Sequence, residues 1–209
     1  LWPPSMTVQT LFPAPLRHAA IGDDALRTSL EKVCWVLEDE DEAGNDWCDQ
    51  EGYDGYTSYA SLDDLPERFP EVAELQAFLD AEAANFARDL HWDMQDQTLE
   101  LNGLWVNILG ESGSHSGHIH PGSVISGTYY VSLPEGAGQL KFEDPRLGFM
   151  MAAPQPEDDA PETARRFVYV SPKEGHAIMW ESWLRHEVMP NRSERPRLSI
   201  SFNYALKRG

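Results

Sequence analysis

The sequence predicts a mainly β protein with flanking helices, built as a β-sandwich or jelly roll. Three observations support this class. A chain of 209 residues with 41% hydrophobic side chains suits a single domain with one core. From residue 103 onward, short apolar segments alternate with turns at the spacing of a sandwich or barrel. Before residue 103, two long segments have helical periodicity instead.

Residues 1–102 are expected to supply an N-terminal strand and supporting helices. Thr7–Phe12 alternates apolar and polar residues and ends at Pro13, which is typical of an edge strand. Such an edge could pair with a second copy, so the sequence leaves both a monomer and a homodimer open. Residues 23–38 and 70–91 repeat apolar side chains at threes and fours, which indicates helices packed outside a sheet.

An acidic run, Glu38–Asp46, lies between the two predicted helices. Aligned with a calcium-binding EF-hand loop from Asp39, it has no oxygen ligand at the fifth position, Ala43, and no bidentate carboxylate at the twelfth, Gln50. We therefore expect a solvated acidic loop.

Residues 103–209 are expected to form the β core that carries the functional site. Its strands are predicted at Gly103–Leu109, His115–His120, Val124–Val131, Gln139–Glu143, Arg166–Val170, Ala177–Trp180, His186–Met189 and Arg197–Leu206.

A long connection, residues 143–165, interrupts the strands with four prolines and an acidic run. A segment of this length indicates either a lid or binding loop, or disorder. Its residues Phe149, Met150 and Met151 are apolar enough to line a pocket.

Charge and cysteine content narrow the expected partners and compartment. Residues 1–100 hold 5 Lys and Arg against 23 Asp and Glu, whereas residues 101–209 hold 11 against 12. The acidic half would repel phosphate, which argues against nucleic acid as a partner. No apolar stretch is long enough for a membrane span, and residues 1–6 show no secretory signal. Cys34 and Cys48 match no disulfide or metal motif, so a reduced, cytoplasmic protein is expected.

Three histidines suggest a metal site. His118 and His120 are two residues apart on a predicted strand, so their side chains share a face and can close on one ion. Pro121 and Gly122 then predict a turn that would leave both imidazoles facing a cavity. His186 can join them only if the fold brings distant strands together.

Positive charge gathers near the third histidine, in Arg185, Arg192, Arg195 and Arg197. Arg197 and Ser199 share a face of the last predicted strand. This local field suits a small anionic ligand, although the first three arginines could equally be surface residues.

The segment from about Trp105 to Tyr204 resembles the double-stranded β-helix (cupin-like jelly roll) of the iron(II)- and 2-oxoglutarate-dependent oxygenases. More narrowly, it is similar to a little-characterised bacterial and phage group of them. The matching words are His118-x-His120-Pro-Gly-Ser, Ser126-Gly-x-Tyr-Tyr-Val, Leu140-x-Phe-x-Asp-Pro-Arg146, Ser182-Trp-Leu-x-His186-x-Val-x-Pro-Asn191 and Arg197-x-Ser-Ile-Ser-Phe-Asn203.

This resemblance implies Fe(II) as the metal, 2-oxoglutarate and molecular oxygen as cosubstrates, and hydroxylation of a primary substrate that the sequence does not identify. It implies that His118 and His186 are ligands and that Arg197, with Ser199 and Tyr130, binds the distal carboxylate of 2-oxoglutarate. Asn107 and Asn203 are further pocket candidates.

His120 stands where most of the superfamily has Asp or Glu. Three neutral imidazoles leave the ion formally at +2, which favours an anionic chelating ligand but also resembles a three-histidine zinc site. Glu187 or Asp144 could replace His120, although Glu187 should face away from His186 and Asp144 precedes a turn.

The remaining histidines have other expected places. His115 is expected to support the ligands or lie in a loop, and His18, His91 and His176 to be structural or on the surface. The alternative function is a cupin-like three-histidine metalloprotein that does not use 2-oxoglutarate: a dioxygenase, a zinc hydrolase or a non-catalytic binding module.

Overall fold

The computed structural model of the protein describes residues 10–146 and 152–208. The elements in these residues are β1 (Arg17–Ala20), α1 (Asp24–Glu40), α2 (Glu42–Glu51), β2 (Gly55–Thr57), α3 (Leu65–Arg68), α4 (Pro70–Asp89), β3 (Gln97–Leu109), β4 (His115–His118), β5 (Ile125–Ser132), β6 (Leu140–Glu143), η1 (a 3-10 helix, Glu162–Ala164), β7 (Phe167–Val170), β8 (His176–Glu181), β9 (His186–Val188) and β10 (Arg197–Arg208).

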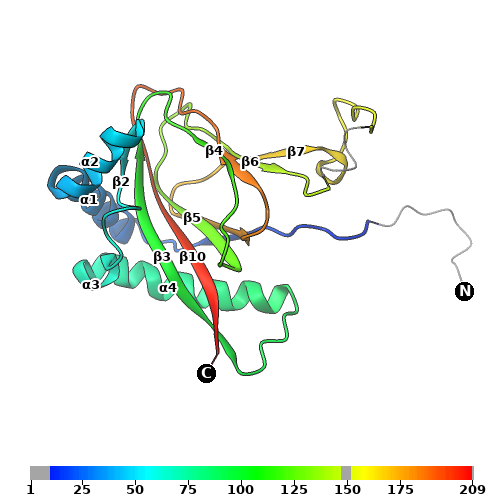
Figure 1. The fold of residues 1–209 in the computed structure, drawn as a ribbon, viewed down its shortest axis with the longest axis horizontal. Coiled ribbons are helices and arrows are strands. Elements are labelled where there is room, and N and C mark those ends of the chain that lie inside the picture. Colours follow the sequence, from blue (N-terminus) through cyan, green and yellow to red (C-terminus); the bar gives the residue numbers. More distant parts are fainter. Residues whose placement is uncertain (1–9, 147–151, 209) are drawn as a thin grey trace, which may run out of the picture.

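Two antiparallel sheets form the fold, and the helices lie to one side of them (Figure 1). The larger sheet has the strand order β1-β8-β5-β10-β3-β2, and the smaller one has the order β4-β9-β6-β7. This is the double-stranded β-helix, so the predicted fold class is confirmed. The eight strands predicted beyond residue 103 are all present, and β3 begins earlier than predicted, at Gln97.

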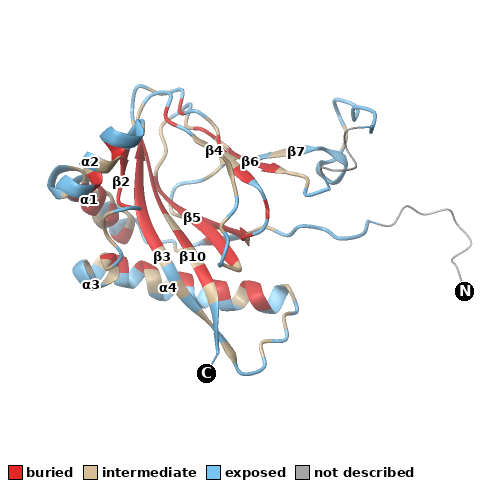
Figure 2. Ribbon diagram, viewed as in Figure 1, coloured by how far each residue is buried: buried red, intermediate tan, exposed pale blue. Residues whose placement is uncertain are grey.

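The larger sheet buries its two faces against different partners. On β10, Leu198, Ile200, Phe202 and Tyr204 pack with α1 and α4 in the largest hydrophobic cluster, whose buried residues are coloured red in Figure 2. This cluster joins side chains from both halves of the chain, which supports our proposal that residues 1–209 fold as one domain.

The opposite face of the larger sheet turns toward the smaller sheet. There a second cluster contains Leu109, Tyr130, Leu140, Phe142, Ile178, Trp180, Leu184 and Val188. Because side chains alternate along a strand, Arg197 and Ser199 of β10 also point to this inner face, where both are buried. The space between the sheets therefore holds the polar residues that the sequence singled out.

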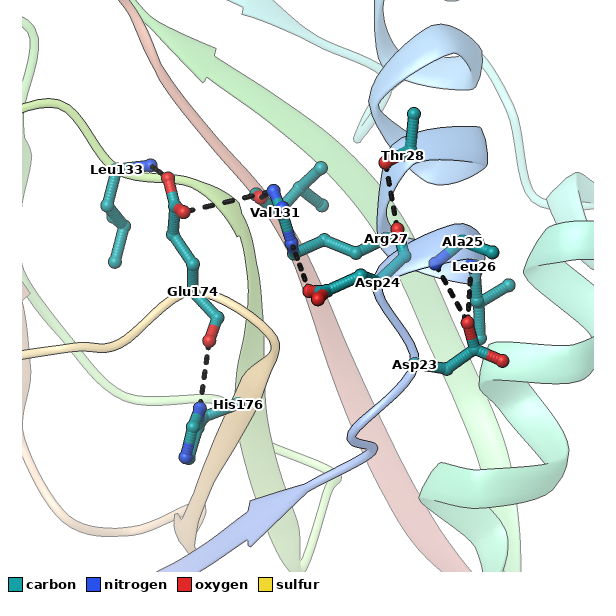
Figure 3. A network of polar contacts seen from close by, with 10 residues as sticks. All are labelled: Asp23, Asp24, Ala25, Leu26, Arg27, Thr28, Val131, Leu133, Glu174 and His176. Carbon is teal, nitrogen blue, oxygen red and sulfur yellow. Dashed lines mark hydrogen bonds and ion pairs between the residues drawn. The ribbon is translucent and has the colours of Figure 1, made fainter.

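Helix α1 is fixed to the end of β5 by a polar network (Figure 3). Asp23 caps the helix, because its carboxylate accepts the backbone N–H groups of Ala25 and Leu26 at 2.8 and 3.0 Å. One turn later, Arg27 donates to the Val131 carbonyl at 3.2 Å. These contacts hold the helical layer in register with the sheet that carries the inner polar face.

Two predictions for the first half are wrong. The acidic run is not a solvated loop: residues 38–40 end α1, and residues 42–46 begin α2. The reason lies in Asp41, which caps α2 by accepting Gly44 N–H and also accepts the Tyr56 hydroxyl at 2.9 Å. The predicted edge strand is not formed at Thr10–Phe12, which are exposed, and the first strand of the described residues is β1.

The described residues leave out part of the long connection and contain no membrane-spanning helix. Phe149, Met150 and Met151, predicted to line a pocket, lie outside the described residues. Within residues 10–146 and 152–208, no helix has the length and apolar composition to cross a bilayer.

Candidate metal centre

Antiparallel pairing of β4 with β9 places two of the candidate ligands opposite each other. His118 is the register partner of His186, and their ring centroids are 4.4 Å apart. Beyond the end of β4, the backbone N–H of His120 donates to the Ser182 carbonyl at 3.2 Å. The His120 ring then lies 5.0 Å from the His118 ring and 5.2 Å from the His186 ring. One ligand atom from each histidine lies within 4.8 Å of the other two, a geometry that could hold one metal ion.

Hydrogen bonds orient two of these rings for metal binding. Nδ1 of His118 lies 2.6 Å from the Ser116 carbonyl, and Nδ1 of His186 lies 3.0 Å from the Leu184 carbonyl. A carbonyl oxygen only accepts, so Nδ1 carries the proton in both rings and Nε2 keeps its lone pair. A histidine that donates through one ring nitrogen presents the other to a metal, so both rings are prepared as ligands.

Burial keeps the imidazoles of this region neutral. Burial, together with a smaller effect of nearby His118, lowers the pKa of His186 to about 3 and that of His120 to about 4. Metal ions bind the neutral form of imidazole, so these shifts favour binding over protonation.

The two carboxylates considered as replacements for His120 form ion pairs with other side chains. Glu187 accepts from the Lys141 ammonium at 3.0 Å, and Asp144 accepts from the Arg146 guanidinium at 2.9 Å. In the part of the chain that the structure describes, His118, His120 and His186 form the only cluster of His, Cys, Asp or Glu side chains with metal-binding geometry. Neither replacement therefore gains support.

Arg197 is a buried cation without a carboxylate partner among the described residues. Its Nη1 donates to Ser199 Oγ at 3.2 Å, and its guanidinium carbon lies 5.2 Å from the centre of the Tyr130 ring. Arg197 Nε and Nη2, and the Tyr130 hydroxyl, have no hydrogen-bond partner within the described residues. Buried polar groups are almost always paired, so this group of unused donors fits an anionic ligand such as a carboxylate.

The other arginines near His186 lie at the surface. Arg192 and Arg195 are exposed, and Arg185 is half-exposed and pairs with Glu143 at 3.1 Å. Only Arg197 of the four belongs to the space between the sheets.

A polar ladder occupies the inner face near the histidines. Asn107 donates to Ser201 Oγ at 3.1 Å and accepts from the Thr57 hydroxyl at 3.0 Å. The Tyr53 hydroxyl lies 2.6 Å from His115 Nε2 and 3.3 Å from Asn107 Oδ1. Burial, followed by the charge of Arg197, lowers the pKa of His115 to about 3, so this histidine is a neutral neighbour of the arginine.

The histidines and these polar residues border one cavity of about 540 Å³, whose walls include the aromatic side chains of Trp47, Tyr53, Tyr59, Trp105 and Trp180. Arg197, Ser199 and Tyr130 are buried and are not among the residues that line this cavity. Trp180 packs at 4.6 Å from the His186 ring, and its Nε1 has no hydrogen-bond partner among the described residues. This volume lies within the range of small-molecule sites, and the walls combine aromatic side chains with the polar groups described above.

Sequence reasoning missed several residues of this cavity. Tyr53 and Thr57 come from the half of the chain that we expected only to support the sheet, and β2 was not predicted. In the sequence, β2 corresponds to the three residues Gly55-Tyr56-Thr57, and so short a segment cannot be distinguished from a turn. His18, His91 and His176 lie outside the metal-binding cluster.

The lowered histidine pKa values predict how the stability of the metal-free protein depends on pH. Unfolding returns His115, His120 and His186 toward the ordinary value of about 6.5, so below that pH the unfolded chain binds more protons than the folded one. The free energy of unfolding should therefore fall as the pH drops from 6.5 toward 4. Urea denaturation at several pH values measures this.

One variant isolates the effect from that of the many carboxylates. His115→Gln should show a shallower fall than the parent protein over this pH range, whereas His18→Gln, at an exposed site on β1, should match the parent. Equal slopes for the parent and His115→Gln would contradict the assigned burial effect.

A three-histidine cluster on a double-stranded β-helix, together with a buried arginine between its sheets, is the arrangement expected of a metal-dependent enzyme that binds a small anion. Residues 103–203 match the model of a family described as "Putative 2OG-Fe(II) oxygenase". No curated protein matches the chain in sequence. The matched segment contains the three histidines, Arg197, Ser199 and Tyr130.

Solved structures similar to this chain agree in fold. A Pseudomonas putida prolyl-4-hydroxylase aligns with 91% of this chain and 87% of its own, at 16% identity and a TM-score of 0.56. HygX from Streptomyces hygroscopicus, solved with nickel and 2-oxoglutarate, aligns with 92% of this chain and 82% of its own, at 13% identity and a TM-score of 0.59. The epimerase SnoN, solved with Fe3+, alpha ketoglutarate and nogalamycin RO, aligns with 92% of this chain and 80% of its own, at 16% identity and a TM-score of 0.60.

Over residues 103–203, just under half of its length, the chain matches the iron(II)- and 2-oxoglutarate-dependent oxygenases. It is thus a non-haem iron enzyme that uses 2-oxoglutarate and molecular oxygen as cosubstrates, as its sequence motifs predicted. The donor set agrees with this metal, since imidazole is a good ligand for iron.

Proposed function

We propose that this oxygenase hydroxylates its substrate at an iron centre held by His118, His120 and His186, with Arg197, Ser199 and Tyr130 binding 2-oxoglutarate. The observation that carries this assignment is the buried Arg197 guanidinium, whose Nε and Nη2 have no partner among the described residues. Iron(II) bound to the three imidazoles supplies the activation of oxygen that couples decarboxylation of 2-oxoglutarate to succinate with substrate oxidation.

The buried donors select a dicarboxylate cosubstrate. Arg197 has two unused N–H groups and Tyr130 an unused hydroxyl, and Ser199 adds a hydroxyl that already contacts the guanidinium. A carboxylate placed there would neutralise a charge whose burial lowers the pKa of Arg197. The charge of Arg197 acts on the pKa of His115, which lines the cavity together with the three histidines, so we expect the second carboxylate of the same molecule to extend toward the histidine cluster.

The charge of the ligand set favours the same cosubstrate. Three neutral imidazoles leave a divalent ion with its full charge of +2, whereas two histidines and one carboxylate leave +1. An anionic chelator offsets that charge, so His120 in the place of an acid should increase the attraction for 2-oxoglutarate.

The aromatic walls serve to limit water around the reacting groups. Trp105 and Trp180 are almost fully buried, whereas Tyr59 and Ile119 at the same cavity are exposed. We propose that the primary substrate enters on the exposed side, between Tyr59 and Ile119, and presents a C–H bond to the metal.

Addition of 2-oxoglutarate to the iron(II) protein without oxygen tests this function. Chelation of iron(II) by the cosubstrate should produce a visible charge-transfer band, and admission of oxygen should then release succinate even without substrate. No band, together with tightly held zinc in the purified protein, would favour a three-histidine metalloprotein that does not use 2-oxoglutarate.

The setting of this activity is also a proposal. Both cysteines are free and buried, which supports a reducing compartment such as the cytoplasm. The acidic N-terminal half still argues against nucleic acid as a partner.

The homodimer stays a prediction, and β1, at one edge of the larger sheet, replaces Thr7–Phe12 as the strand that would pair.

A further inference from the structure

The third candidate ligand differs from the other two in what holds its ring. His118 and His186 direct Nδ1 to backbone carbonyls, whereas His120 directs Nδ1 to the side-chain amide of Asn203, with Nδ2 at 3.4 Å. The inner face of β10 therefore contributes a side chain that touches the metal centre, at its residue Asn203.

We propose that Asn203 is a positioning residue that makes His120 a metal ligand by fixing its tautomer. This inference rests on the proposed function of His120 and adds the residue that controls it. A carbonyl oxygen can only accept, but a carboxamide can accept through Oδ1 or donate through Nδ2. The tautomer of His120 therefore depends on which end of the amide faces the ring.

Only one of the two amide orientations allows His120 to bind through Nε2. With Nδ2 facing the ring, His120 Nδ1 must accept, and the ring proton then occupies Nε2 and blocks it. With Oδ1 facing the ring, Nδ1 donates and Nε2 keeps its lone pair, as in His118 and His186. The 3.4 Å separation exceeds the usual 2.9–3.0 Å of such bonds, and rotation of the amide would place an acceptor there.

A chain of hydroxyl groups can follow this rotation. Ser126 Oγ lies 2.7 Å from Asn203 Oδ1 and 2.8 Å from Ser182 Oγ, and both serines are buried. A hydroxyl both donates and accepts, so Ser126 can donate to Ser182 while it accepts from Asn203 Nδ2. Ser182 also holds the backbone N–H of His120 through its carbonyl, so the chain contacts His120 at its backbone and at its ring.

Substitutions at Asn203 should change zinc affinity in opposite directions. Zinc is a suitable probe because it binds neutral imidazole and needs neither oxygen nor 2-oxoglutarate. Asn203→Ala removes the Nδ1 partner and should weaken zinc binding about 10- to 100-fold, the usual effect of losing a group that orients a ligand. Asn203→Asp can only accept from Nδ1, so it should strengthen zinc binding. Asn102→Ala is the matched control, because the Asn102 amide forms its side-chain hydrogen bonds with Ser123 in the described part of the chain, and this variant should leave the affinity unchanged.

The same substitution in a protein without His120 distinguishes an effect on the ring orientation of His120 from an effect of the added charge. The added carboxylate of Asn203→Asp could attract zinc without acting on His120 at all. In a His120→Ala background, the tautomer effect disappears, so Asn203→Asp should bind zinc within about twofold of the same protein with Asn203. An equal gain in both backgrounds overturns the proposal.

The tautomer itself is measured by nitrogen NMR of the histidine rings in the zinc-loaded protein. His120 should show a slowly exchanging Nδ1 proton, and this proton should exchange faster in Asn203→Ala. The proposal is wrong if that proton and the zinc affinity are the same in Asn203→Ala as in the parent protein. Neither readout depends on oxygenase activity, so the proposed function can fail or succeed separately.

Discussion

Replacement of Arg197 by methionine should weaken binding of 2-oxoglutarate by two to four orders of magnitude, at roughly 10²- to 10⁴-fold, and leave metal binding nearly intact. The guanidinium has two N–H groups without partners among the described residues, and each bond to a carboxylate contributes about 1.5–3 kcal/mol. Loss of both corresponds to about 3–6 kcal/mol, or roughly 10²- to 10⁴-fold in the concentration of 2-oxoglutarate required. Calorimetric titration of the iron-free, zinc-loaded protein with 2-oxoglutarate measures this directly.

The same variant should not be less stable when 2-oxoglutarate is absent. A buried charge without an opposite charge is costly, and its replacement by an apolar side chain of similar length is often neutral or stabilising. We expect Arg197→Met to have a Tm at least equal to that of the parent, but to lose the rise in Tm that 2-oxoglutarate gives the parent. Arg195→Met, at an exposed position, should keep this rise. If 2-oxoglutarate raises the Tm of Arg197→Met as much as that of the parent, Arg197 does not bind the cosubstrate.

Replacement of His186 by leucine should remove metal binding. His186 is the most buried of the three candidate ligands, and its ring lies within 5.2 Å of both other rings. Loss of a residue that merely orients a ligand costs 10- to 100-fold in affinity, so loss of a ligand should cost more than about 100-fold. Leucine fills much of the space beside Trp180 with apolar atoms, which limits the effect on folding.

Metal content after dialysis against iron(II), and succinate release, give the two readouts for this variant. Both should fall to background in His186→Leu, whereas His18→Leu, on β1 and away from the cluster, should match the parent. Retention of stoichiometric iron by a folded His186→Leu protein would exclude His186 as a ligand.

The second half of the fold was predictable because its strands alternate or are apolar throughout. In β10, residues 198, 200, 202 and 204 face the helices, and 197, 199, 201 and 203 face the smaller sheet. This period of two is visible in the sequence, as are the His-x-His spacing at the end of β4 and the turn after it. The pairing of His118 with His186 was not visible, because register between strands separated by 68 positions depends on the whole fold.

The first half was less predictable because side chains, not periodicity, decide its local structure. The sequence of the acidic run predicts a solvated loop. In the structure, Asp41 instead caps α2 and accepts hydrogen bonds from the hydroxyl groups of Tyr56 and Ser61. Strand β2 has three residues, too few for a pattern, yet it delivers Thr57 to the cavity. Tyr53 reaches His115 through the same local arrangement.

The residues expected to bind the metal and the cosubstrate could be predicted from the sequence, but the residues that surround and orient them could not. Arg197, Ser199 and Tyr130 follow from motifs, but Tyr53, Thr57 and Trp180 enter the cavity from three other elements or loops. Asn203 was a pocket candidate in the sequence, and its contact with His120 gives it a specific position beside a ligand. Such contacts depend on neighbouring strands in the sheet, which a single sequence does not specify.

A crystal structure of the protein grown without oxygen, with iron(II) and 2-oxoglutarate, tests the account most directly through the anomalous scattering of iron. We predict one iron peak at bonding distance from Nε2 of His118, His120 and His186, with a carboxylate of 2-oxoglutarate against Arg197. An iron peak coordinated by other side chains, or 2-oxoglutarate bound away from Arg197, would contradict the account.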